Sequence, residues 1–412
     1  MILRRYRWVL AGLALGLAAK GAGAVEVNSL YGFELLGGQY FFNGQRGNLG
    51  GDVLGYYAPA MKFDENWSLL PSINASYQGT KQVLDVAGAG TLFQQQMDYR
   101  GSVTGIYQKP GSLWRLKPTA SYKYELLKET NDENWGGGLF DYQKWDVGLG
   151  ADYVYKDPYA VRMSVDYYEL HFPHYTSLES QAALDFNGQP LARELIGDYV
   201  LDTRNVAASV GMDFPMGDKL VLSGGAAAAL EMFPNQRIVD ASGLLDSPLR
   251  QDVVTMVTAG GKYAIEKSSL FRMLASLDAG FTYDSSNQNS YDAVNTVFIP
   301  GYYNYWEASL GPSLKFFWGP KDEAIALQLS ATGWYRDYPQ RPAQDGTGIY
   351  LSETVHTTTG MLAANFTYPL VPHLDFLVNV QLGRALSNMQ FQQFYAYNYT
   401  VENYMFGFRY DF

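Results

Sequence analysis

The sequence predicts an all-β protein, a transmembrane antiparallel up-and-down β-barrel of about 16 strands. Three observations predict it. Segments of roughly 10–16 residues alternate apolar and polar side chains, as β-strands do. The connections between these segments alternate between short and long. Beyond residue 24, no apolar run approaches the roughly 18 residues that indicate a membrane-spanning helix, so any crossing must use strands closed into a barrel.

The first 24 residues have the pattern of a secretory signal peptide. Three arginines precede an apolar run of 12 residues from Trp8 to Ala19, and the small-residue stretch GAGA ends at Ala24. The run is shorter than the roughly 20 residues of a membrane helix. We therefore expect cleavage after Ala24, export of the chain, and a single barrel domain over 25–412.

The composition excludes several function classes. The chain carries 30 Lys+Arg and 41 Asp+Glu; removal of the four basic residues in the signal leaves 26 against 41, a net charge of −15. This acidity argues against nucleic acid as a partner. Because the chain has no cysteine, it has no disulfides and no thiolate metal ligands.

The alternation is clearest in WRLKPTASYKYEL, residues 114–126. Trp114 and Tyr122 share an apolar face, whereas Arg115 and Lys117 lie on the opposite face. Aromatic residues at both ends of the apolar faces favour a lipid belt between two aromatic girdles over the core of a soluble sandwich. Candidate girdle residues are Trp114, Tyr155, Phe281, Trp318, Tyr368, Phe408 and Tyr410. Strands are expected near 29–42, 51–63, 67–78, 92–108, 113–128, 140–155, 159–172, 203–214, 219–232, 251–265, 269–284, 302–318, 324–338, 352–369, 374–388 and 397–412.

The connections sort by length onto two sides. Short ones are expected at 64–66, 109–112, 156–158, 215–218, 266–268, 319–323 and 370–373, and longer ones at 79–91, 129–139, 173–202, 233–250, 285–301 and 339–351. An even strand number brings both chain ends to the side of the short turns. Proline removes a ladder hydrogen bond, and Pro59, Pro71, Pro118 and Pro312 fall inside expected strands, so counts of 14 or 18 stay open.

The chain ends in YMFGFRYDF, an aromatic strand that alternates to its last residue. Five aromatic side chains share one face: Tyr404, Phe406, Phe408, Tyr410 and Phe412. This stretch resembles the closing strand of Gram-negative outer-membrane β-barrels. The resemblance implies recognition by the barrel-assembly machinery and contact with outer-membrane lipid and lipopolysaccharide. It also implies a location in the outer membrane, with the short turns and both termini in the periplasm.

A barrel of 16 strands is too wide for wall side chains to fill, and porins of that size leave an aqueous channel. The longest connection, 173–202, has mild helical character in the LARELIG stretch near its centre. This loop either folds inward and narrows the channel, or stays outside and caps its mouth.

Charged side chains on the expected lumen face are the candidate determinants of selectivity. The basic ones cluster on the fourth to seventh strands, beside acidic partners on the same strands. A basic ladder that faces acids across a pore sets ion selectivity; alternatively, paired charges neutralise one another. The candidates are Arg100, Arg115, Lys117, Lys123, Lys144, Arg162, Arg272, Asp98, Glu125, Asp146, Asp152, Asp166 and Asp278.

The sequence gives little support for catalysis, and we expect no enzyme, no cofactor and no metal site. The four histidines are His171, His174, His356 and His373. Some outer-membrane barrels are proteases with Asp/His pairs at the rim, and others are lipases with a Ser/His pair on the outer wall. His171 and His174 lie near acids, and His356 near hydroxyls, but neither enzyme's motif is apparent.

The sequence therefore predicts a porin-like channel for passive diffusion of small hydrophilic solutes or ions. One alternative is the conduit of an export system for polysaccharide or another polymer, working with periplasmic partners. The aromatic stretches 301–306 and 393–399 would suit sugar stacking there. A variant is a barrel that sheathes a partner protein. A further alternative is a closed barrel that serves as an adhesin or structural protein. By analogy of fold, a porin-like barrel suggests a homotrimer.

Overall fold

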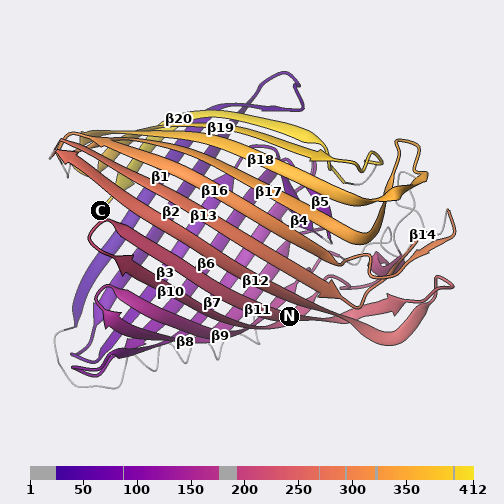
Figure 1. The fold of residues 1–412 in the computed structure, drawn as a ribbon, viewed down its shortest axis with the longest axis horizontal. Helices are drawn as coiled ribbons and strands as arrows, with labels where there is room; N and C mark the ends of the chain where they lie inside the picture. The colour runs from indigo at the N-terminus through magenta and orange to yellow at the C-terminus, as the bar shows by residue number, and fades with distance from the viewer. Residues whose placement is uncertain are drawn as a thin grey trace.

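The computed structural model describes residues 25–412 except 87, 176–192, 269, 293–294, 321–322 and 393–394. The expected signal peptide therefore lies outside the described residues. Sixteen strands form one closed antiparallel barrel, seen side-on in Figure 1. They are β1 (Glu26–Phe42), β2 (Asn48–Lys62), β3 (Trp67–Gln78), β6 (Gln95–Tyr107), β7 (Trp114–Lys128), β8 (Tyr142–Lys156), β9 (Tyr159–His171), β10 (Thr203–Met216), β11 (Leu220–Val239), β12 (Leu245–Ser268), β13 (Phe271–Ser286), β16 (Tyr305–Trp318), β17 (Ile325–Gln344), β18 (Tyr350–Val371), β19 (Leu374–Ser387) and β20 (Tyr399–Asp411).

The predicted fold class and the strand count of 16 are confirmed. Each barrel strand pairs with the barrel strands before and after it, and β1 pairs with β20 to close the ring. Seven short turns lie at one end of the barrel, which we call the turn end, and all the long connections lie at the other, the loop end (Figure 1, left and right). The C-terminus is at the turn end, where the backbone of Phe412 pairs with that of Tyr31.

Two expected long loops are instead extensions of barrel strands. β11 continues to Val239 and β12 begins at Leu245, so the expected loop 233–250 is mostly a hairpin. β17 continues to Gln344 and β18 begins at Tyr350, so the expected loop 339–351 is also mostly a hairpin. Register shifts after Met232 and after Asp337 allow each pair to bend as it continues beyond the regular ladder.

The four prolines fit into strands because the ladder is interrupted beside them. Pairing of β2 with β3 skips the rows that hold Pro59 and Pro71. Pairing of β6 with β7 skips Pro118, and pairing of β16 with β17 skips Pro312. Each proline therefore stands where its missing N–H removes no ladder bond on that side. This explains why the prolines do not change the strand count.

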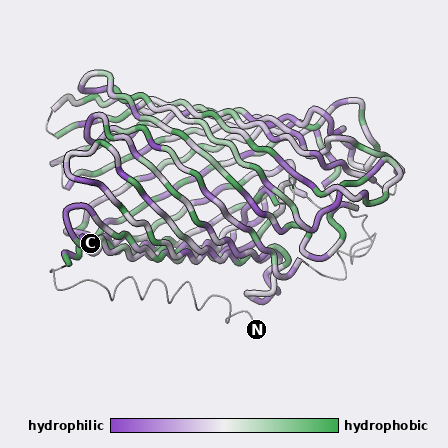
Figure 2. The backbone as a smooth tube through the Cα atoms, turned by 90° about the horizontal axis from the view of Figure 1, so that it is seen from below, coloured by the Kyte–Doolittle hydropathy of each residue, from purple (hydrophilic) through white to green (hydrophobic). Residues whose placement is uncertain are grey.

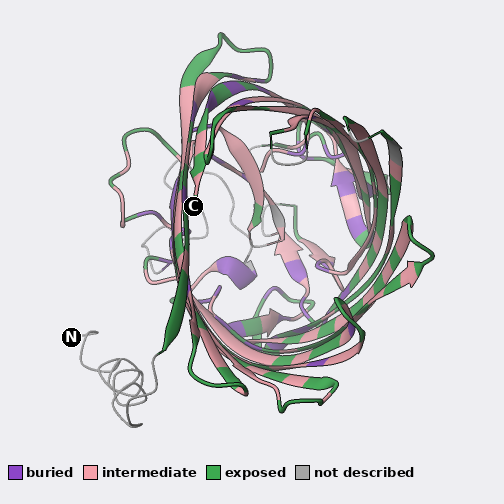
Figure 3. Ribbon diagram, turned by 90° about the vertical axis from the view of Figure 1, so that its left-hand side faces the viewer, coloured by how far each residue is buried: buried purple, intermediate pink, exposed green. Residues whose placement is uncertain are grey.

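The two faces of the wall differ as the alternation predicts. On β20 the aromatic side chains from Tyr404 to Phe412 are exposed, whereas Met405 is 3% exposed on the inner face. Exposed and less exposed residues alternate along the strands in Figure 3, and hydrophobic segments recur around the wall in Figure 2. No helix within the described residues is long and apolar enough to cross a membrane.

Aromatic pairs mark both edges of the outer face. Near the turn end the ring centroids of Trp67 and Tyr107 lie 4.7 Å apart, and nearer the loop end those of Trp306 and Tyr335 lie 5.3 Å apart. Of the expected girdle residues, these are exposed: Trp114, Phe281, Trp318, Tyr368, Phe408 and Tyr410. Tyr155 differs, because its hydroxyl donates to the backbone carbonyl of Asp213 beside an irregular stretch of the β8–β9 pairing.

Candidate functional site in the barrel lumen

Most of the predicted charged residues form a patch on the inner wall of β6–β9. Arg100, Lys123 and Lys144 stand directly opposite one another in one cross-strand row. The ammonium of Lys123 lies 2.7 Å from a carboxylate oxygen of Asp98 and also contacts Glu125. The acids are therefore next to the bases on the same wall. They do not face them across the pore.

A second group of the same patch lies nearer the turn end. The carboxylate of Asp152 lies 2.8 Å from Lys117 and 3.9 Å from Arg115. Arg162 pairs with Asp213, an acid on β10 that the sequence analysis did not select. A cross-strand neighbour is visible only after register is known, so this partner had no local signal in the sequence.

The other members of the patch have contacts with neutral groups or no ion pair at all among the described residues. Lys144 lies 3.9 Å above the ring of Tyr168, and Asp166 accepts a hydrogen bond from Ser164. Arg100 makes no ion pair among the described residues, and Asp146 shares its row with Tyr168 on the next strand. Two candidates are not brought to the patch: Arg272 and Asp278 both lie on β13, with Arg272 over the ring of Phe317 at 5.2 Å.

A cavity of about 810 Å³ occupies the middle and turn half of the lumen. Most of its lining is small, and it includes Thr119, Ser164, Ser209, Ser223, Thr258 and Thr332. Five of the predicted residues line it as well: Lys117, Asp152, Arg162, Asp166 and Asp278. Small hydroxyl side chains leave room for water, so this half of the lumen is wide and polar.

The loop half of the lumen is narrowed by inward-folded connections. One is a hairpin of β4 (Gln82–Val86) and β5 (Ala89–Phe93), here called the strap. Others contain the 3-10 helix η2 (Arg193–Leu195) and the hairpin of β14 (Ser290–Asp292) with β15 (Val297–Ile299). In the view along the barrel in Figure 3, segments of these connections lie within the ring.

The strap, which lies between β3 and β6, is tied to β17 and to the connection before β20. Asp85 forms an ion pair with Arg336, which also bonds Glu307 at 2.9 Å. The carbonyl oxygen of Gly88 accepts from both terminal nitrogens of Arg341, at 3.2 and 3.3 Å. The backbone of Ala396 donates to the carbonyl of Gly90 at 2.8 Å.

Gly88 has to be glycine, because its φ is +82° and an added Cβ would lie 2.8 Å from the ring of Tyr303. Arg341 is 1% exposed and lies between two tyrosine rings, with its guanidinium carbon 3.9 Å from the centroids of Tyr302 and Tyr338. Arg341 thus bonds carbonyl oxygens and stacks on rings, and it has no carboxylate partner among the described residues.

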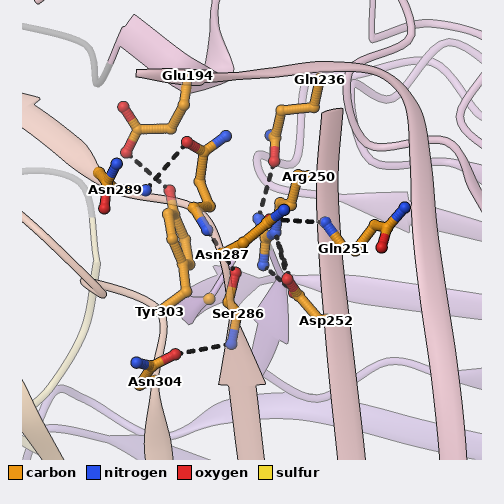
Figure 4. Close-up of polar contacts among 12 residues, drawn as sticks. Glu194, Gln236, Arg250, Gln251, Asp252, Ser286, Asn287, Asn289, Tyr303 and Asn304 are labelled. Atoms are coloured by element: carbon orange, nitrogen blue, oxygen red, sulfur yellow. Dashed lines mark hydrogen bonds and ion pairs between the residues drawn. The ribbon is translucent and has the colours of Figure 1, made fainter. Parts of the chain in front are cut away.

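A second buried arginine anchors the β11–β12 side of the loop half. Arg250 binds the carboxylate of Asp252 through two nitrogens and donates to Gln236 at 3.0 Å (Figure 4). The carboxylate of Glu194 on η2 accepts a 3.0 Å hydrogen bond from Tyr303. Burial raises the pKa of Glu194 above its usual range. The loop half is therefore a packed and hydrogen-bonded assembly.

The expected loop 173–202 contributes to this assembly through its described end. Leu195, Val200 and Leu201 are buried with Phe93 of the strap and Phe140 in one apolar cluster. Residues 176–192 of the expected constriction lie outside the described part. The sequence analysis did not anticipate that the strap would fold inward, since five-residue strands inside a polar loop give little periodicity.

Each of the two aromatic loop stretches contributes a buried tyrosine. Tyr303 is 3% exposed and Tyr397 is 7% exposed, and both belong to the packing around the buried arginines. An arginine in a low-dielectric site is stabilised by aromatic faces, which explains why these tyrosines turn inward.

The histidines lie at the rims. The Nδ1 atom of His171 is 2.6 Å from a carboxylate oxygen of Asp202, and the Nδ1 atom of His373 is 2.8 Å from the backbone oxygen of Asp411. The ring of His356 stacks on Tyr335 with centroids 6.2 Å apart. No group of three or more metal-ligating acids or histidines lies within the described ranges.

No protein-family model matches this sequence, and no curated protein matches it. The structure is similar to a bacterial polysaccharide outer membrane secretin, at 11% identity and a TM-score of 0.44, over 93% of this chain and 98% of that one. It is also similar to a trimer form of OmpT, an outer membrane protein of Vibrio cholerae, at 10% identity and a TM-score of 0.41, over 95% and 100% of the two chains. It is similar as well to OccD3 of Pseudomonas aeruginosa, at 9% identity and a TM-score of 0.43, over 95% of this chain and 92% of that one.

At such low identities and TM-scores these likenesses carry no functional argument. The architecture of the barrel, in contrast, supports a conclusion about the location of the protein. Sixteen antiparallel strands close with no free edge, and the wall is apolar outside and polar inside. This is the outer-membrane β-barrel fold, and it places the chain in the outer membrane of a Gram-negative bacterium.

Proposed function

We propose that this chain is a porin-like outer-membrane channel, and not an enzyme, through which small hydrophilic solutes or ions diffuse passively. Residues 1–24 are removed on export, and 25–412 form the single barrel domain. The turn end and both termini face the periplasm, and the loop end faces outward. The strap and its neighbours set the size limit, while the charged patch on β6–β9 sets the ion preference.

The observation that carries this proposal is the division of the lumen. A cavity of about 810 Å³ with small polar and charged lining occupies its turn half. Lys117, Asp152 and Arg162 line this cavity, and charged groups are costly to hold away from water, so this lining favours a water-filled pathway. The neighbouring strap narrows the pathway.

The test is single-channel conductance of the refolded barrel in a planar bilayer, with reversal potential measured across a salt gradient. Stable openings are expected, because the described loops narrow a lumen that remains polar. Silence from a barrel that is demonstrably folded and heat-modifiable would contradict passive diffusion.

The second candidate function is the conduit of an export system that opens only with periplasmic partners. The loop half favours it, since strap, η2 and the stretch around Ala396 interlock across the lumen. A barrel that is silent alone but conducts after periplasmic extract is added from the turn end would support this second function.

Assembly is the remaining part of the proposal. The exposed aromatic face of β20 serves as the recognition signal for the barrel-assembly machinery, and the assembled barrel forms a homotrimer. Phe412→Ser is expected to reduce the amount of assembled, heat-modifiable barrel in cells. An unchanged amount of barrel would contradict this role of Phe412, and crosslinking in native membranes would report the oligomer.

A further inference from the structure

The outer wall carries a pocket that faces away from the lumen, close to the loop end. Its volume is about 230 Å³, and its walls come from β7–β11 and the adjoining loop ends. Six of its lining residues carry the argument: Tyr122, Trp145, Glu169, His171, Asp202 and Arg204. Strand alternation places the strand members outward, because Val165 on β9 and Val206 on β10 are exposed apolar residues of the same faces.

The depth of this pocket follows from strand register. Tyr122, Trp145, Glu169 and Arg204 stand opposite one another in one cross-strand row. The parallel row two residues nearer the turn end is apolar and aromatic: Ala120, Val147, Tyr167, Val206 and Leu230. The pocket thus begins where the apolar belt ends, at the depth of lipid headgroups.

A charged pair on a lipid-facing wall is costly unless it lies at the interface or meets a polar partner. Glu169 accepts hydrogen bonds from Tyr167 at 2.6 Å and Trp145 at 3.2 Å, and it forms an ion pair with Arg204 at 3.4 Å. Arg204 contributes only its Nε atom to this pair, and its side chain is 60% exposed. Its two terminal nitrogens are therefore accessible to a partner from outside the chain.

The lining matches one kind of headgroup. Arginine binds phosphate through paired nitrogens, aromatic faces stack on sugar rings, and the carboxylates of Glu169 and Asp202 accept bonds from hydroxyl groups. The volume is smaller than that of drug-sized pockets, so the pocket takes a headgroup while the acyl chains lie along the belt below it.

We propose that this outer-wall pocket binds the phosphorylated sugar headgroup of an outer-leaflet glycolipid, with Arg204 on the phosphate and Trp145 against the sugar. The proposal does not depend on passive diffusion through the lumen, since every residue it uses is on the opposite face of the wall. It shares with the proposed function only the outward orientation of the loop end.

The test uses the full-length barrel in detergent with added lipopolysaccharide, and separately with phosphatidylethanolamine, and counts retained lipid by native mass spectrometry. Arg204→Gln is expected to weaken lipopolysaccharide retention about tenfold or more, because a bond between charged groups is lost. Trp145→Leu is expected to weaken it as well. Arg384→Gln on β19 is the matched control, since Arg384 is an exposed arginine in a strand on another part of the wall, and it is expected to retain lipid like the wild type.

Conductance of all three variants is measured in parallel and is expected to match the wild type, which separates this test from that of the proposed function. Equal retention by Arg204→Gln and wild type would overturn the proposal. If Arg204→Gln lost phosphatidylethanolamine as much as lipopolysaccharide, the pocket would be a general headgroup site, and this result would also overturn the proposal. A changed oligomeric state without changed lipid retention would also overturn it, since it would identify the pocket as a subunit contact.

Discussion

The turn half and the loop half of the lumen hold their charges in different ways. In the turn half, Lys117 and Asp152 pair on the wall beside a cavity of about 810 Å³. In the loop half, Arg341 is 1% exposed and lies between two tyrosine rings. Ion pairs beside water contribute little free energy, so their side chains can rearrange easily. Removing the partners of a buried cation is strongly destabilising, so the groups around Arg341 are held in place.

Under the proposed function, this comparison predicts that passage through the barrel is controlled at the loop end. Most of the candidate selectivity residues lie on the β6–β9 wall, whereas the arginines that hold the strap, Arg336 and Arg341, lie on β17. The proposed function therefore assigns the size limit and the ion preference to different residues, and substitutions should separate the two properties.

The largest effect is expected from Arg341→Ala. It removes two ring contacts, worth about 2 kcal/mol or more in a desolvated site, and the bonds to Gly88 at the tip of the strap. The strap should detach, and unitary conductance should rise several-fold. Single-channel recording checks this, with the outer-wall variant Arg384→Ala as control. A folded Arg341→Ala barrel with wild-type conductance would show that the strap does not narrow the pore.

Lys123→Gln should change ion preference without changing the size limit. Lys123 contacts both Asp98 and Glu125, so its removal leaves two carboxylates unbalanced. A unit charge at about 4 Å in water is worth about 1 kcal/mol, so the cation-to-anion permeability ratio should rise by up to about fivefold. Arg100→Gln, which leaves no broken ion pair behind, is expected to shift the reversal potential less. The reverse order would contradict the pairing described above.

The loop after β7 should loosen as pH rises. Burial, and then the nearby Glu133, raise the pKa of Glu129 to about 7. The folded state therefore binds a proton that the unfolded chain releases near its usual pKa of 4.5, and stability falls between about pH 4.5 and 7. Hydrogen exchange of 129–141, corrected for intrinsic rates, should be faster at pH 8 than at pH 5. Glu129→Gln should remove the difference; if it persists, another group is responsible.

The smallest effect on the opening of the strap is expected from Asp85→Asn. Asp85 is partly exposed and Arg336 keeps its bond to Glu307, so the coupling between Asp85 and Arg336 should be about 1 kcal/mol or less. A double-mutant cycle with Arg336→Gln, using the frequency of strap opening in single-channel records, measures it. A coupling larger than the effect of Arg341→Ala would show that the Asp85–Arg336 ion pair holds the strap more strongly than Arg341 does, which contradicts this prediction.

The barrel was predictable from sequence because strand period and connection length are local signals. All sixteen strands were expected near their observed positions, and the aromatic face of β20 is exposed as its alternation predicts. The loops 233–250 and 339–351 were mispredicted, since a hairpin that continues past the membrane has polar residues on both faces.

The lumen was predictable only in part. Strand alternation placed Lys123 and Asp152 inside, but it could not show that their partners lie on neighbouring strands, because register is not local. Nor could it show that Tyr302 and Tyr303 turn inward, since that depends on Arg341, far along the chain. The long-range packing of short loop segments produces no periodic pattern in the amino-acid sequence.

Accessibility of single cysteines tests most directly whether the lumen is open in its turn half and narrowed in its loop half. The chain has no native cysteine, so Ser209→Cys in the cavity can be labelled alone, with Val206→Cys on the outer face of the same strand as the control. A bulky, membrane-impermeant maleimide should label Ser209→Cys from the turn end and not from the loop end, while a small thiol reagent should reach it from both. Equal labelling by the bulky reagent from both ends, or none from either, would contradict this account.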